Sequence, residues 1–159
     1  MNVQQRVGAT EDRIGQVLSR LYTVISFEEG GEPDWQGLSE IFSEHARITR
    51  VTPEGTDYLD PRSFLRMTQH LHDVGAYTSF YEFELARHVE VFGDVAQVWS
   101  FYETRRNRAA QRALGRGVNS IQLIRDEQSW RVLSLLWDEA HASAALTLSS
   151  VFPERGQYA

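Results

Sequence analysis

The feature that most constrains this chain is a long apolar hairpin, Gly117 to Ala140, which reads GVNSIQLIRDEQSWRVLSLLWDEA. Two apolar-rich runs meet there at a short polar turn over residues 126–129. A hairpin this long and this apolar needs cover over both of its faces, because exposed apolar surface is unfavourable in water. The hairpin therefore predicts the wall of a larger packed structure.

The rest of the chain reads as helices first and strands afterwards, which is typical of an α+β fold. Thr10 can cap a helix whose apolar residues continue at helical spacing to Ile25. A short helix is predicted after Asp34, and Asp60-Pro61 opens a third helix that ends near Gly75. Strands are predicted at 46–51, 83–91, 95–106, 115–125 and 130–140, with turns at 53–57 and 93–94.

This order of elements predicts a strongly curved, antiparallel or mixed sheet that wraps around about three N-terminal helices. In such a cone the helices fill the narrow part, and the mouth stays open as a central pocket. The chain has 159 residues, which is the length of one domain. We expect this domain to span residues 1–142 and residues 143–159 to be a C-terminal tail.

Composition argues against several classes of function. The chain has no cysteine, which excludes disulfides, thiolate zinc sites and thiol nucleophiles. The five histidines show no ligand spacing, so neither a metal nor a cofactor is predicted. A net charge of −6 argues against a nucleic-acid surface. No apolar run approaches the roughly 20 residues that span a membrane, and the N-terminus lacks a signal-peptide core, so we expect a cytoplasmic protein.

The basic residues of the chain are unusual in kind and in placement. All sixteen are arginines, and five of them cluster at positions 105, 106, 108, 112 and 116. The cluster has two interpretations, a solvated hairpin tip or a patch for an anion or an acidic partner. The sequence leaves both open.

Three stretches of the chain resemble members of the nuclear-transport-factor-2-like superfamily, which includes ketosteroid isomerases, scytalone dehydratases and polyketide cyclases. They are DWQGLSEIFSEHARI at 34–48, GDVAQVWSFYETR at 93–105 and SIQLIRDEQSWRVLSLLWDE at 120–139. With the first helix, the resemblance covers about residues 10–140. It implies a cone-shaped, cystatin-like α+β fold. It does not imply one activity, because members include enzymes, small-molecule binders and dimerisation modules.

The ketosteroid isomerase pattern can be compared with this sequence position by position. Its general base falls on Arg50, and an arginine stays protonated and takes no proton from carbon at neutral pH. Its oxyanion-holding aspartate falls on Ser120, and its oxyanion tyrosine falls on Leu21 or Tyr22. Its late-strand tryptophan is matched by Trp137. The resemblance thus argues against steroid isomerisation by that mechanism.

Strand alternation predicts which side chains face the pocket once Trp137 is placed inside. The predicted ligand-binding set is Tyr22, Arg50, Ser100, Tyr102, Ser120, Gln122, Leu135 and Trp137. Further residues predicted on the inner face are Val98, Thr104, Ile124, Arg131 and Leu133. The predicted outer face is strongly apolar, with Trp99, Phe101, Ile121, Leu123, Val132 and Leu136. Such a face predicts a homodimer packed sheet against sheet, as the resemblance also implies.

Three functions stay open at this point. The first is binding of an apolar molecule with an acidic or carbonyl group, which Arg50 and Tyr102 would orient. The second is a lyase, isomerase or cyclase that uses Tyr/His acid–base chemistry, for which the available side chains are Tyr22, Tyr58, His70 and His88. The third is a structural dimerisation module. Arg50 also has a plainer interpretation, an ion pair with a neighbouring carboxylate.

Overall fold

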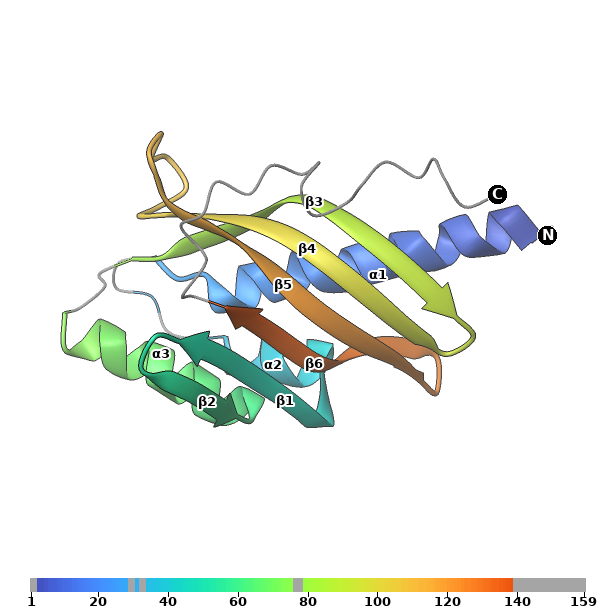
Figure 1. Cartoon of the computed structure of the whole chain (residues 1–159), viewed down its shortest axis with the longest axis horizontal. Coiled ribbons are helices and arrows are strands. Elements are labelled where there is room, and N and C mark those ends of the chain that lie inside the picture. The colour runs from blue at the N-terminus through green and yellow to red at the C-terminus, as the bar shows by residue number, and fades with distance from the viewer. Residues whose placement is uncertain (1–2, 29–30, 32–33, 76–78, 139–159) are drawn as a thin grey trace.

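In the computed structural model of the chain, helices and strands form an α+β fold, as predicted (Figure 1). The structure describes residues 3–28, 31, 34–75 and 79–138, apart from the side chains of residues 3–7 and 72, so the predicted tail lies outside the described residues. The elements follow the order α1 (Val3–Ile25), α2 (Trp35–Ile41), β1 (Phe42–Thr52), β2 (Gly55–Leu59), α3 (Pro61–Asp73), β3 (Tyr81–Phe92), β4 (Val95–Arg105), β5 (Ala113–Asp126) and β6 (Ser129–Asp138).

The strands form one mixed sheet in the order β2-β1-β6-β5-β4-β3. Neighbouring strands are antiparallel except β1 and β6, which are parallel. The sheet stays open, with β2 and β3 as its edges. In Figure 1, α1 lies across one face of the longer strands, and α3 lies beside β1 and β2. Among the described residues, no helix is long and apolar enough to cross a membrane.

The core lies between the helices and the inner face of the sheet. The apolar stripe of α1 is buried at helical spacing and contains Ile14, Leu18, Leu21 and Ile25. The sheet residues in the same cluster include Val98, Ile121, Leu123, Val132 and Leu135. Burial of each such side chain stabilises the fold by about 1.5–3 kcal/mol. This packing holds the curved sheet against α1.

The caps predicted at Asp34 and Asp60 are confirmed, whereas Thr10 lies inside α1. Asp34 accepts a hydrogen bond from the Gly37 N–H at 2.8 Å, and α2 follows it directly. Asp60 accepts one from the Ser63 N–H at 2.7 Å, with Pro61 in the first position of α3. These caps fix where α2 and α3 begin.

The first helix begins earlier than predicted, at Val3 instead of after Thr10. The reason is that the segment before Thr10 contains good helix formers and lacks proline. Gly8 costs a helix only about 1 kcal/mol, so it does not interrupt α1.

The segment 53–57 is a strand over most of its length, although a turn is predicted there. Only Pro53 and Glu54 form the turn, and Gly55–Leu59 is β2, which pairs with β1 from Thr52↔Gly55 to Ile48↔Leu59. This edge strand has only five residues and buries none of them fully. A strand so short and so exposed gives little apolar alternation in the sequence.

The two faces of β5 are reversed relative to the prediction. Asn119, not Ser120, is opposite Trp137, so Asn119 shares the inner face with Trp137. Ile121 and Leu123 consequently belong to the core, and Ser120, Gln122 and Ile124 lie on the outer face. Because side chains alternate along a strand, an error of one residue moves every side chain to the other face.

A β-bulge explains the wrong prediction for β6. Gln122 pairs with Ser134, but the next residue, Leu123, pairs with Val132, so Leu133 is the extra residue. Val132 is therefore fully buried instead of outward-facing, and Leu133 lies on the outer face. Arg131, predicted to face the pocket, donates instead to the Ser39 carbonyl at the end of α2, at 2.7 Å.

Candidate functional site

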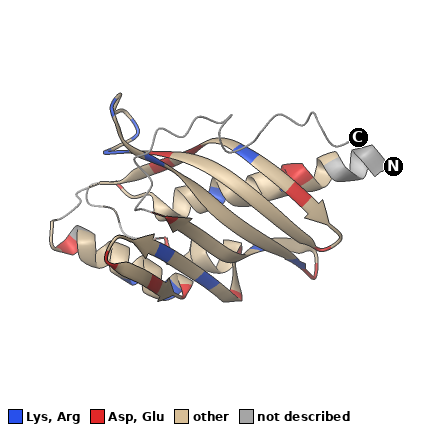
Figure 2. Cartoon of the chain, in the orientation of Figure 1, with Lys and Arg blue, Asp and Glu red and all other residues tan. Residues whose placement is uncertain are grey.

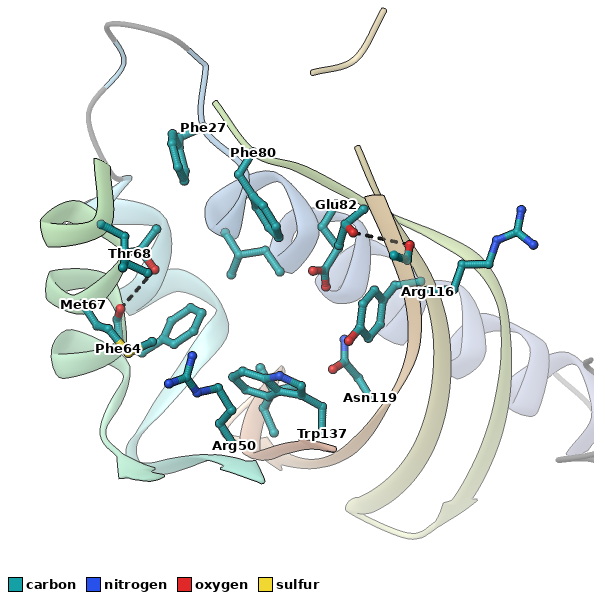
Figure 3. Close-up of a pocket in the computed structure, with 16 residues that line it drawn as sticks. Phe27, Arg50, Phe64, Met67, Thr68, Phe80, Glu82, Arg116, Asn119 and Trp137 are labelled. Atoms are coloured by element: carbon teal, nitrogen blue, oxygen red, sulfur yellow. Dashed lines mark hydrogen bonds between the residues drawn. The ribbon is translucent and has the colours of Figure 1, made fainter. Parts of the chain in front are cut away.

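A cavity of about 310 Å³ lies between α3, the end of α1 and the inner face of the sheet (Figure 3). Its walls are mainly apolar, and its aromatic residues are Phe27, Phe64, Phe80, Tyr102 and Trp137. Its polar side chains include Arg50, Thr68, Glu82, Tyr102, Thr104 and Asn119. Apolar walls with a few polar groups are typical of a small-molecule site.

The aromatic wall is formed by Trp137 near the end of β6 and Phe64 in the first turns of α3. Their ring centroids are 6.0 Å apart and their planes meet at 81°, an edge-to-face contact. The Asp60 cap sets the position of Phe64, because it fixes the start of α3 four residues earlier. The cavity wall thus depends on a local signal that the sequence shows.

Arg50 extends from β1 between Asp57 on β2 and Trp137 on β6. Its Nε lies 2.9 Å and its Nη2 lies 2.8 Å from Asp57 Oδ2. Arg50 therefore fits both interpretations of the sequence, because it pairs with a carboxylate and also lines the cavity. Asp57 holds the guanidinium in place, which reduces the entropy that Arg50 would lose on binding a ligand.

Glu82, which sequence analysis missed, lies at the start of β3 with its side chain directed into the cavity (Figure 3). The residue is only 9% exposed. Its N–H donates to Ser26 Oγ at 3.0 Å, and Ser26 Oγ also lies 3.2 Å from the Glu82 carbonyl, so Ser26 ties β3 to the end of α1. A carboxylate buried in a largely apolar cavity is a candidate functional group. The pairing Glu82↔Thr104 is the strand register that would have indicated it.

A buried chain of hydrogen bonds lies beneath the cavity, with Tyr22 at its centre. Asn119 Nδ2 donates to the Tyr22 hydroxyl at 3.1 Å, and this hydroxyl lies 2.7 Å from Ser100 Oγ. Ser100 Oγ donates to the Glu84 carboxylate, which also pairs with Arg87 Nε at 2.6 Å. Because the Ser100 proton is directed at Glu84, the Tyr22 proton is directed at Ser100. Asn119 is the member of this chain that also lines the cavity.

Tyr22 is a hydrogen-bond donor in this chain and not a base. Burial raises the pKa of Tyr22 above its ordinary value of 10.0, and the negative charge of Glu82 raises that pKa further. The hydrogen bonds with Ser100 and Asn119 lower the pKa, but to a smaller extent. The phenol of Tyr22 is therefore neutral at physiological pH.

The predicted ligand-binding residues divide into three groups in the structure. The ones that line the cavity are Arg50, Tyr102, Leu135 and Trp137. Tyr22 and Ser100 are buried beneath it and bond to each other. Ser120 and Gln122 lie on the opposite face of the sheet, where Gln97 Nε2 donates to Ser120 Oγ at 3.2 Å. The parity error on β5 accounts for these last two residues.

The residues available for Tyr/His chemistry are not brought together at the cavity. His45 and His70 are exposed, and His88 Nε2 lies 3.3 Å from Glu90 Oε1. Tyr58 is 78% exposed on the edge strand. Of the histidine side chains that the structure describes, none lines the cavity. Within the same part of the chain, no group of three or more His, Cys, Asp or Glu residues could hold a metal ion.

Comparison with known proteins identifies the fold. Neither a protein-family model nor a curated protein matches the sequence. A nuclear-transport-factor-2-like protein with a cystatin-like fold from Novosphingobium aromaticivorans superposes with a TM-score of 0.65 and 16% identity, over 93% of this chain and 91% of that one. A Nostoc punctiforme protein of unknown function with a cystatin-like fold gives 0.63 and 12%, over 87% and 94%. LinA gives 0.62 and 14%, over 86% and 89%. The chain has the nuclear-transport-factor-2-like fold.

This fold is the one that the sequence resemblance implied. The identities of 12–16% mean that the likeness shows the fold alone. A nuclear-transport-factor-2-like fold hosts unrelated activities, so the function has to be argued from the cavity and its side chains.

Proposed function

We propose that the cavity binds a small, largely apolar molecule that carries a carboxylate or a polarised carbonyl group. The observation that supports this most is the Arg50 guanidinium at the wall of a cavity that is otherwise lined mainly by aromatic and aliphatic side chains. A volume of about 310 Å³ is at the lower end of the range for small-ligand sites.

The two kinds of wall have different roles in this proposal. Trp137 and Phe64 offer ring surfaces against which an aromatic or alicyclic ligand packs. Arg50 offers charged donors, and it is pre-oriented by its ion pair with Asp57. Tyr102 and Asn119 come from β4 and β5 and add neutral polar groups on the sheet side. The ligand is therefore oriented with its acid or carbonyl toward Arg50.

The first prediction concerns Arg50→Met, which removes the charge but keeps a flexible apolar stem. Phenylacetate, cinnamate and phenylpyruvate should raise the melting temperature of the wild-type protein more than their neutral amides do. In the variant the affinity for the acids should fall by about 10-fold or more, because a hydrogen bond to a charged group contributes about 1.5–3 kcal/mol. Calorimetry or ligand-observed NMR measures this difference.

Arg47→Met is the matched control, because Arg47 is exposed on the same strand and lies outside the cavity lining. It should leave the affinity for the acids unchanged. Equal affinity for acids in the wild-type protein and in Arg50→Met would contradict the assigned role of Arg50. Absence of binding by any member of the panel would contradict the binding function itself.

We also propose that two copies of the chain pair through the outer faces of their sheets. The middle parts of β4, β5 and β6 contain no charged residue (Figure 2). Trp99, Ser120 and Leu136 form one row across these strands, and Trp99 and Leu136 are 40% and 39% exposed. The expected contribution of Ile121 and Leu123 to this contact is wrong, because both are buried on the inner face.

A further inference from the structure

One row of neighbouring residues crosses the whole sheet beside the cavity. From β2 to β3 its members, each opposite the next in the strand pairing, are Asp57, Arg50, Trp137, Asn119, Ser100 and Arg87. Arg50 and Asn119 both line the cavity and lie on either side of Trp137 (Figure 3). Since neighbouring strands are about 4.8 Å apart, the Cα atoms of Arg50 and Asn119 are separated by about 10 Å. The cation and the amide are therefore the two polar ends of one apolar surface.

The hydrogen bonds behind Asn119 all run in one direction, away from the cavity. At the far end the Glu84 carboxylate pairs with Arg87, and because a carboxylate only accepts, the Ser100 hydroxyl donates to it. Ser100 Oγ in turn accepts the Tyr22 proton across 2.7 Å. With its own proton committed, the Tyr22 hydroxyl accepts from Asn119 at 3.1 Å, and only the Nδ2 end of an amide can donate. The Asn119 amide oxygen, Oδ1, is therefore fixed on the side away from Tyr22.

This amide oxygen is the part of the hydrogen-bonded chain that is left for a ligand. Asn119 is only 4% exposed, and in Figure 3 its side chain reaches the cavity beside Trp137. Among the residues that the structure describes, none donates a hydrogen bond to Asn119 Oδ1. Within the same part of the chain, every fully enclosed side-chain oxygen has a partner, so Asn119 Oδ1 is reached from the cavity. A molecule that fills the cavity without a donor at this point leaves a buried acceptor unpaired, which is unfavourable.

We infer that Asn119 Oδ1 accepts a hydrogen bond from the ligand, and that the ligand carries a hydroxyl group at the end of its ring opposite the acid or carbonyl. The inference rests on the proposed binding function, in which Arg50 holds the acid or carbonyl. A ring that packs against Trp137 places one polar end at Arg50 and the other at Asn119. Asn119 thereby determines specificity, because an ether or carbonyl oxygen at the same point meets a second acceptor and gains no hydrogen bond.

The test compares the affinities of 4-hydroxyphenylacetate and 4-hydroxycinnamate with those of phenylacetate and cinnamate, measured by calorimetry or ligand-observed NMR. The wild-type protein should bind the 4-hydroxy acids about 3- to 10-fold more tightly, which is the usual range for one neutral hydrogen bond. The 4-methoxy acids keep the oxygen but lack the donor, so they should show no gain. Nor should 2-hydroxycinnamate, because its hydroxyl group lies on the acid side of the ring.

Asn119→Leu keeps the approximate size and shape of the side chain but removes the amide oxygen. In this variant the 4-hydroxy acids should lose their advantage and bind no more tightly than the unsubstituted acids. Gln122→Leu is the matched control, because it removes an exposed amide from the outer face of the same strand. It should keep the wild-type preference for the 4-hydroxy acids. Circular dichroism measures the folding of both variants.

Absence of binding by every acid counts against the proposed binding function. Binding of the acids without a preference for the 4-hydroxy compounds overturns the role of Asn119 and leaves that function standing. A preference that persists in Asn119→Leu also overturns it, because another acceptor at the wall, such as Glu82, would then hold the hydroxyl group. If Asn119→Leu does not fold, Asn119→Ser takes its place, since serine keeps a polar group but is too short to hold an acceptor at the same point. That variant should likewise lose the preference.

Discussion

At the scale of single residues, the buried Tyr22 hydroxyl makes hydrogen bonds with two other buried side chains. Tyr22→Phe keeps the ring in the core but removes the acceptor of Asn119 Nδ2 and the partner of Ser100 Oγ. Because buried polar groups would lose their partners, the free energy of unfolding should fall by about 1–3 kcal/mol in urea denaturation. Tyr58→Phe is the control, since Tyr58 is 78% exposed, and it should change stability by less than about 0.5 kcal/mol.

The stability difference between the wild-type protein and Tyr22→Phe should shrink at high pH. Burial raises the pKa of Tyr22 in the folded protein, whereas in the unfolded chain it keeps its ordinary value of 10.0. Above that pH the unfolded chain releases this proton and the folded protein retains it, so this contribution to stability is complete below the unfolded pKa and is lost as pH rises. The wild-type advantage over Tyr22→Phe should shrink by up to about 1.4 kcal/mol per pH unit there. A constant difference across that range would show that Tyr22 is not shielded.

At the scale of elements, the Tyr102 ring on β4 lies so close to β5 that position 117 requires a glycine. A Cβ placed on Gly117 would lie 2.4 Å from the Tyr102 hydroxyl oxygen and 2.5 Å from its Cζ. Gly117→Ala should therefore displace the Tyr102 ring from the cavity wall and lower the free energy of unfolding by about 1–3 kcal/mol. Gly8→Ala, in an open position of α1, should instead stabilise the protein by up to about 1 kcal/mol. Thermal unfolding that shifts both variants in the same direction would contradict this account.

The order of elements could be predicted because each carries a local signal. The caps at Asp34 and Asp60, and the turn at Gly93, where φ is +58°, fix element ends. The faces of β5 could not be predicted, because alternation groups Ile121 with Leu123 but does not say which face is inner when both faces are expected to be apolar. A sequence also gives no signal for which residue of β6 forms the bulge.

The candidate site was predictable in part for related reasons. Arg50 and Trp137 follow from strand ends that the resemblance aligns, and both line the cavity. Glu82 was missed because its place depends on the bulge between Glu84 and Ala86, which changes the face that β3 presents. Long-range pairing with Thr104, which only the folded chain shows, places Glu82 inside.

At the scale of the whole molecule, three of the five clustered arginines contact other residues of the same chain. The Arg105 and Arg116 side chains pair with the buried carboxylate of Glu103 at 2.7 and 2.8 Å. The hydrogen bonds from Arg116 and Arg105 hold the pKa of Glu103 below its usual range. Arg108 lies over the Tyr81 ring at 5.4 Å. Arg105 and Arg116 therefore stabilise the end of the β4–β5 hairpin.

The last prediction tests the pairing of two copies through the outer face. In a two-fold dimer the same surface meets itself, so Trp99→Arg places two cations near each other across the contact. Sedimentation velocity should show a dimer for the wild-type protein and a monomer for Trp99→Arg, with unchanged circular dichroism. Tyr58→Arg should remain dimeric, because Tyr58 is on β2 at the other end of the sheet. A monomeric wild-type protein, or a dimeric Trp99→Arg variant, would exclude this face as the contact. If the dimer dissociates while the acids still bind, the cavity is complete within one chain.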